Sequence, residues 1–131
     1  MSALEFMSAD HVAAMNALLE DAPQVRKACA GLSGDRSMGY RLVGGPDGAD
    51  VHWTVTFTDT VRFFLTEQMT PDVLFVGDWR QMIRASKASR DGEQLDPAVS
   101  IVGDAAVLAE IGPVMETARS VATLPITFPD A

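Results

Sequence analysis

A short phrase that occurs twice in the second half of the chain limits what this sequence can fold into. Val73–Asp78 reads VLFVGD, and Val99–Asp104 reads VSIVGD. In each copy a β-rich run ends at glycine, where the chain can turn freely, and aspartate then stands as the N-cap of a following helix. The phrase therefore predicts two strand–turn–helix units.

The helices expected behind the two aspartates are amphipathic, so each needs an apolar surface to cover. One face behind Asp78 carries Trp79, Met82, Ile83 and Ser86. The face behind Asp104 carries Val107, Leu108, Ile111, Met115 and Ala118. Gly112-Pro113 interrupts the second stripe, and we expect it to kink or split that helix.

The first half of the chain predicts helices followed by a strand meander. Ser8–Leu32 has helical periodicity and divides at Pro23, since proline is tolerated in a first turn but not inside a helix. After a Gly/Ser-rich link over Gly31–Gly39, we expect a strand at Tyr40–Val43 and a turn at Gly44–Gly48. Residues 51–58 alternate in polarity as the returning strand, and residues 61–65 form a third strand.

This order of elements, with its two Val-Gly-Asp phrases, resembles the sterol carrier protein type 2 (sterol-transfer) domain family over roughly Ala9 to Val121, as a stand-alone bacterial member. The resemblance implies an α/β (α+β) fold: a mixed five-stranded sheet with helices packed on one face. It also implies an apolar tunnel between sheet and helices that takes lipids, sterols or acyl chains. The link Asp91–Pro97 departs from the family's shorter link, which puts the tunnel mouth in doubt.

In such a tunnel, apolar burial at roughly 25 cal/mol per Å² would supply most of the binding free energy. Regularly spaced methionine and aromatic residues are also typical of plain core, and the sequence leaves both interpretations open. The candidate ligand-binding residues are Trp53, Val55, Phe57, Phe63, Phe75, Trp79, Met82, Ile83, Leu108, Ile111 and Met115.

Basic residues gather between Trp79 and Arg90, a stretch without an acidic residue in a chain of net charge -8. Such a stripe can steer an anionic head group or dock an acidic partner. A solvated helix face paired with carboxylates is the alternative. The candidates for head-group or partner contact are Arg80, Arg84 and Arg62, and we expect Arg62 to point outward from its apolar strand.

Catalytic and metal chemistry find little support. His11 and His52 lack partners at metal-ligand spacing, and we expect both at the surface. The sequence contains no nucleophile elbow, P-loop or dinucleotide fingerprint. We therefore assign no catalytic residue and expect no metal and no cofactor. Cys29 shares a helix face with Val25, so we expect it in the core.

Composition limits the partners. The 131 residues, 47% hydrophobic and 21% charged, are typical of one globular domain spanning 1–131. A sequence pI of about 4.5 opposes binding to nucleic acid and to anionic membranes. Met1–Asp10 lacks the basic start of a secretory signal, and no apolar run approaches the ~20 residues of a membrane span. We expect a cytoplasmic protein without stable membrane insertion.

The leading hypothesis is non-catalytic binding and carrying of a hydrophobic ligand, such as a sterol, fatty-acyl or prenyl lipid. A cofactor-free lyase or isomerase acting in the same cavity, with His52, Asp59 or Tyr40 as proton handlers, is one alternative. An interaction or accessory module without a ligand is the other. It would use Phe63 or Phe64 and the basic helix to contact a second copy or an enzyme.

Overall fold

The computed structural model describes residues 4–67, 70–95 and 99–129. The elements in chain order are β1 (Leu4–Glu5), α1 (Ala9–Glu20), α2 (Pro23–Ala30), β2 (Arg36–Val43), β3 (Val51–Phe57), β4 (Val61–Phe64), β5 (Val73–Asp78), α3 (Trp79–Arg90), β6 (Val99–Gly103), α4 (Ala105–Val121) and β7 (Ile126–Thr127).

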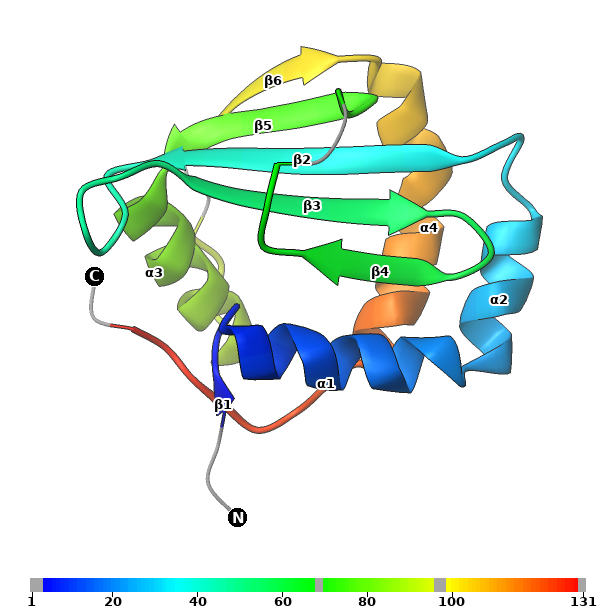
Figure 1. The fold of residues 1–131 in the computed structure, drawn as a ribbon, viewed down its shortest axis with the longest axis horizontal. Helices are drawn as coiled ribbons and strands as arrows, with labels where there is room; N and C mark the ends of the chain where they lie inside the picture. Colours follow the sequence, from blue (N-terminus) through cyan, green and yellow to red (C-terminus); the bar gives the residue numbers. More distant parts are fainter. Residues whose placement is uncertain (1–3, 68–69, 96–98, 130–131) are drawn as a thin grey trace.

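Five strands form one mixed sheet in the order β4-β3-β2-β5-β6, which confirms the predicted fold class (Figure 1). Strands β2 and β5 are parallel, and the other neighbours are antiparallel. The register places Trp53, Tyr40 and Phe75 opposite one another on three adjacent strands. These three rings therefore form a row across one face of the sheet.

The helices cover that same face, and the main core lies between the two layers (Figure 1). From the sheet come Val55, Phe57 and Val73, each at most 1% exposed, and from the helices come Leu19 and Val25, both fully buried. Period-two alternation along β3 explains this placement, because every second side chain points toward the helices. Cys29 also lies in this core, as predicted.

The two aspartates cap their helices as predicted. The Asp78 carboxylate accepts a hydrogen bond from the Gln81 N–H at 3.0 Å, and that of Asp104 accepts one from the Ala106 N–H at 2.9 Å. The two glycines before them differ. Gly103 has a φ of +118°, and a Cβ there would overlap the Asp72 carbonyl oxygen. At the first copy, β5 instead continues to Asp78, so the free turn at glycine predicted there is wrong.

The structure corrects two further expectations. Of the kink or split expected at Gly112-Pro113, the split is wrong, because α4 runs unbroken from Ala105 to Val121, and the kink stays a prediction. Gly112 and Pro113 are exposed, so the carbonyl left without its helical donor lies on the solvent side, where water can bond it. In addition, β2 begins at Arg36, inside the predicted link, because Arg36 already pairs with Phe57 of β3.

A second, two-stranded sheet joins the two ends of the described chain, and it was not predicted. Strands β1 and β7 pair in parallel, with Leu4 opposite Ile126. The link Asp91–Pro97 is described only as far as Leu95, so its last part lies outside the described residues. Within the described ranges, none of the helices combines the length and apolar character needed to cross a bilayer.

Candidate functional site

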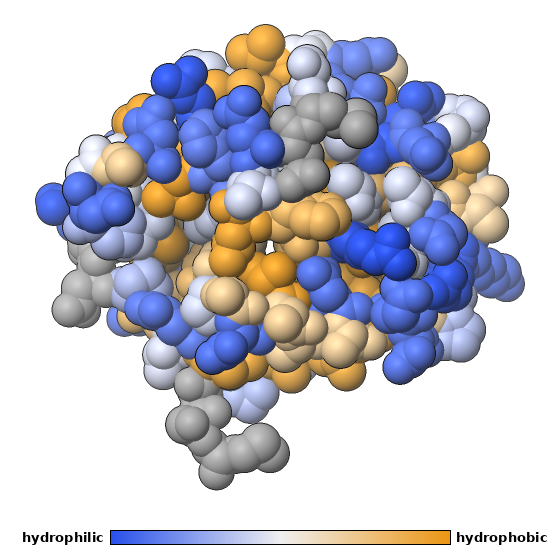
Figure 2. Space-filling view, viewed as in Figure 1, coloured by the Kyte–Doolittle hydropathy of each residue, from blue (hydrophilic) through white to orange (hydrophobic). Residues whose placement is uncertain are grey.

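A cavity of about 440 Å³ lies between the inner face of the sheet and helices α1, α3 and α4. It is partly open, and Figure 2 shows hydrophobic surface around a hollow between β4 and α1. The described lining residues are Phe6, Met7, His11, Met15, Tyr40, Trp53, Val55, Phe63, Met82, Ala85, Ser86, Ser89, Arg90, Leu95, Met115, Arg119, Ala122, Thr123 and Ile126.

A second hollow, of about 580 Å³, is more open and lies beside the β2–β3 turn, away from the helices. Its described lining includes Asp47, Asp50 and Glu67. Small-molecule sites are mostly apolar and enclose their ligand. We therefore take the cavity between sheet and helices as the candidate site.

The structure places only some of the predicted ligand-binding residues beside this cavity. Those that line it are Trp53, Val55, Phe63, Met82 and Met115. Side chains at most 2% exposed and packed in the core are Phe57, Ile83 and Ile111. Trp79 packs with Leu42 and Ile83 in a second core cluster, whereas Phe75 and Leu108 pack against the main core. The ligand-binding role of the five cavity residues remains a prediction.

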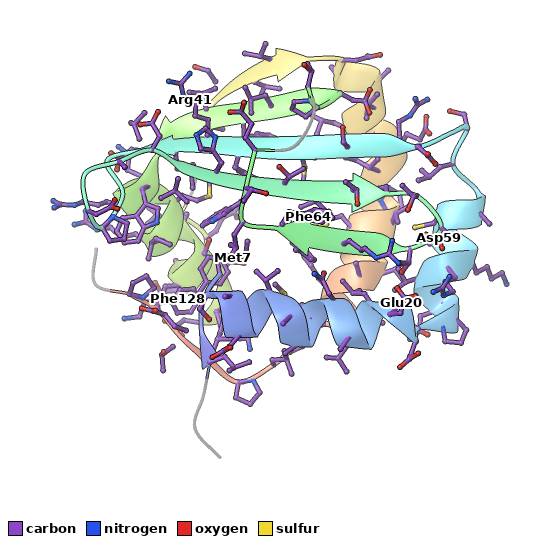
Figure 3. All side chains as sticks on the ribbon, in the orientation of Figure 1. Met7, Glu20, Arg41, Asp59, Phe64 and Phe128 are labelled. Atoms are coloured by element: carbon purple, nitrogen blue, oxygen red, sulfur yellow. The ribbon has the colours of Figure 1, made fainter. Side chains whose placement is uncertain are left out.

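Part of the remaining apolar wall comes from terminal segments that sequence reasoning missed. Phe6 and Met7 follow β1, and Ile126 begins β7. The Phe6 ring meets the Trp53 ring edge-on at 5.7 Å and the Phe128 ring at 5.0 Å. In Figure 3, Met7 and Phe128 lie near the start of α1. Two-residue strands carry no periodicity, so no pattern in the sequence signals this wall.

His11 was expected at the surface, and that prediction is wrong. The side chain is only 4% exposed, because the first turn of α1 packs beneath Phe6, whose ring lies 5.9 Å away. Its Nδ1 accepts a hydrogen bond from the Met7 N–H at 2.9 Å. Burial, and then the positive charge of Arg90, lower the pKa of His11. The imidazole is therefore held neutral in the cavity wall.

Tyr40 is an aromatic residue of the cavity wall. Its ring stacks on Phe75 at 5.1 Å and lies 5.8 Å from Trp53. Burial raises the pKa of Tyr40, a shift that the charge of Arg119 opposes. The hydroxyl is therefore protonated at neutral pH.

The three arginines predicted as head-group contacts do not line the cavity. Arg62 points outward as predicted and pairs with Glu20 at 2.7 Å and with Asp59 at 3.9 Å. These two carboxylates lie at the end of α1 opposite Met7 (Figure 3). Arg80 and Arg84 are exposed and absent from the described lining. The arginines that do line it are Arg90 and Arg119.

The proposed proton handlers are not brought together. The Nδ1 of His52 lies 3.3 Å from a carboxylate oxygen of Glu67, beside the second hollow. Asp59 belongs to the ion-pair cluster with Arg62. Of these three residues only Tyr40 borders the cavity, and its raised pKa keeps it protonated, so it does not serve as a general base at neutral pH. The three residues therefore do not form one site.

Known proteins resemble this chain in fold but not in sequence. No protein-family model and no curated protein matches the sequence. Among solved structures, a conserved hypothetical protein of Thermus thermophilus, described as a candidate sterol carrier protein, matches with a TM-score of 0.61 at 16% identity, covering 93% of this chain and 90% of that one.

Two further structures match. One is a crystal structure of sterol carrier protein 2, with a TM-score of 0.56 at 14% identity, covering 89% of this chain and 96% of that one. The other is sterol carrier protein 2 from Yarrowia lipolytica in its apo form, with a TM-score of 0.53 at 13% identity, covering 86% and 92%. The resemblance seen in the sequence is thus confirmed at the level of the fold, and the chain has the fold of the sterol carrier protein 2 domains.

Proposed function

We propose that the protein binds a hydrophobic small molecule in the cavity between its sheet and its helices, and carries it without chemical change. The observation that carries this proposal is an apolar cavity of about 440 Å³ whose walls come from sheet, helices and both terminal segments. Its volume falls within the ~300–1,000 Å³ typical of small-molecule sites. The sterol carrier protein 2 fold supports the same proposal.

The character of the lining favours a carrier over a site for one rigid ligand. Four of the chain's seven methionines belong to the described lining of the cavity: Met7, Met15, Met82 and Met115. Methionine side chains are flexible and polarizable, so they fit ligands of different shape. We expect the protein to accept several chain lengths instead of selecting one.

Trp53 offers a direct test, because it lines the cavity while Trp79, the only other tryptophan, lies in the core. A Trp79→Phe variant leaves Trp53 as a single fluorescent reporter. Titration with a pyrene-labelled fatty acid and with a fluorescent sterol should quench Trp53 by energy transfer, to saturation at one ligand per chain. Native mass spectrometry of the purified protein should show a copurifying apolar molecule.

Failure of both probes to bind, together with repeated preparations free of any apolar molecule, would remove the carrier proposal. The accessory role then becomes the better explanation. In that case size-exclusion chromatography should show a dimer or a complex with an enzyme. Action in the cytoplasm is part of the carrier proposal, and fractionation of the producing cells tests it separately.

A further inference from the structure

The charges around the cavity are opposite in sign to those of the chain as a whole. The sequence has 18 acidic residues against 10 lysines and arginines. Yet the described lining contains Arg90 and Arg119 and not one aspartate or glutamate. Both arginines are exposed, so they lie where the cavity meets solvent. An apolar cavity in an acidic protein thus has a cationic rim.

Neither guanidinium has a carboxylate partner among the residues that the structure describes. Within the described residues, Arg90 donates a hydrogen bond to the Leu124 carbonyl, and neither Arg90 nor Arg119 forms an ion pair. Elsewhere, ion pairs with carboxylates at 3.3 Å or less hold Arg26, Arg36, Arg41 and Arg62. The two rim arginines therefore keep charge that an incoming anion can meet.

The helix dipole does not by itself explain why Arg90 and Arg119 lie at the cavity. Arg90 and Arg119 lie in the last turns of α3 and α4, where a positive charge favourably opposes the helix dipole. Lys87 occupies the last turn of α3 as well, but it lies outside the described lining of the cavity. The dipole accounts for the sign of these charges and not for their presence at the cavity.

We propose that the ligand is an amphiphile with a carboxylate head group, which Arg90 and Arg119 bind at the rim while the chain lies among the methionine and aromatic side chains. This inference rests on the proposed function. A planar guanidinium binds a carboxylate through two parallel hydrogen bonds, a geometry that a neutral hydroxyl head cannot match. The protein should therefore distinguish a fatty acid from the alcohol of the same chain length.

The test compares dodecanoate with dodecanol by displacement of the pyrene probe at pH 7.5 and low salt. The two ligands share a chain, so the ratio of their affinities reports the head group alone. Each arginine at this exposed rim should raise the affinity for dodecanoate about fivefold through charge-assisted hydrogen bonds. Arg90→Gln and Arg119→Gln should each lose that factor, the double variant should bind both ligands equally, and dodecanol binding should not change.

Arg80→Gln is the matched control, because it removes the same charge from the same helix at a site outside the described lining. It should leave the affinity ratio at the wild-type value. Raising the salt concentration to 0.5 M should shrink the ratio in the wild type, because the Debye length falls to a few ångströms. Thermal unfolding of each variant checks that its fold is intact.

The outcomes separate the head-group inference from the proposed function. Equal affinity of the wild type for dodecanoate and dodecanol, or a ratio that survives in the double variant, would overturn the role of the arginines and leave the carrier intact. A ratio lost equally in Arg80→Gln would attribute it to net charge and would also overturn that role. If neither dodecanoate nor dodecanol displaces a bound pyrene probe, the head-group inference fails and the carrier proposal stands. If the pyrene and sterol probes do not bind and no apolar molecule copurifies, both fail.

Discussion

Ala85 and Ala88 provide a direct test of whether the cavity is truly vacant. The two residues lie on α3 and are nearly equally buried, at 8% and 9% exposure. Ala85 lines the cavity, whereas Ala88 is absent from its described lining. The same substitution to leucine therefore adds three carbons either to open space or to packed core.

The structure predicts opposite signs for the two variants. In Ala85→Leu, each added carbon buried is worth about 0.8 kcal/mol, and the leucine loses roughly 0.5–1 kcal/mol of side-chain entropy. The net result is a stabilisation of about 1.5 kcal/mol. Ala88→Leu overpacks the core and should cost about 1–3 kcal/mol. For a chain of this size, the difference should separate the two melting temperatures by roughly 10 °C.

Thermal unfolding followed by circular dichroism measures this difference, and displacement of the pyrene probe measures its functional counterpart. Ala85→Leu should bind the probe about tenfold more weakly, because it removes room for roughly two methylene groups at 0.8 kcal/mol each. A loss of stability in Ala85→Leu as large as that in Ala88→Leu would refute the reasoning, since it would mean that side chains already fill the space.

Three further predictions concern single residues. Gly103→Ala should lower the free energy of unfolding in urea by about 3 kcal/mol, because the φ of +118° and the nearby Asp72 carbonyl exclude a Cβ at this position. Gly34→Ala is the control: a Cβ there would meet nothing within 4 Å, so stability should change by less than about 0.5 kcal/mol. A loss shared by both variants would contradict this explanation. The folded state lowers the pKa of His11 below its ordinary value of about 6.5. The free energy of unfolding should therefore be highest above that pH and should fall as the pH drops from about 6.5 through the lowered pKa. Urea midpoints at pH 7.5 and 5.5 test this, and His11→Gln should flatten the difference; an unchanged slope would count against it. Burial raises the pKa of Cys29, so its thiol should react with a disulfide reagent at pH 8 far more slowly in the native protein than in urea, and equal rates would show that the thiol is accessible.

Local signals in the sequence predicted the helices and most of the strands. An aspartate after a β-rich run identified both N-caps, and the alternation along β3 identified the buried face of the sheet. Pairing across the chain was harder to predict. The β1–β7 pair joins two-residue strands from opposite ends of the described chain, and neither strand is long enough to show a period.

The residues that line the cavity could be predicted from the sequence only in part. Met82 and Ile83 are neighbours on one apolar stripe, yet Met82 lines the cavity while Ile83 is 2% exposed in the core. Periodicity identifies the face of a helix that turns inward, but whether a side chain meets another or meets space depends on packing between elements. The same holds for the basic residues. Arg80 and Arg90 belong to one helix, but of these two only Arg90 lines the cavity.

If the cavity binds a ligand as proposed, the parallel pair of β1 and β7 should affect how fast that ligand enters and leaves. The backbone hydrogen bonds that join these two terminal segments include those from the Leu4 N–H to the Pro125 carbonyl and from the Phe6 N–H to the Thr127 carbonyl. Separating so short a pair takes far less free energy than unfolding the five-stranded sheet. The rate at which a bound ligand dissociates should therefore depend on how often β1 and β7 separate. Hydrogen exchange at the Phe6 amide measures how often they do so.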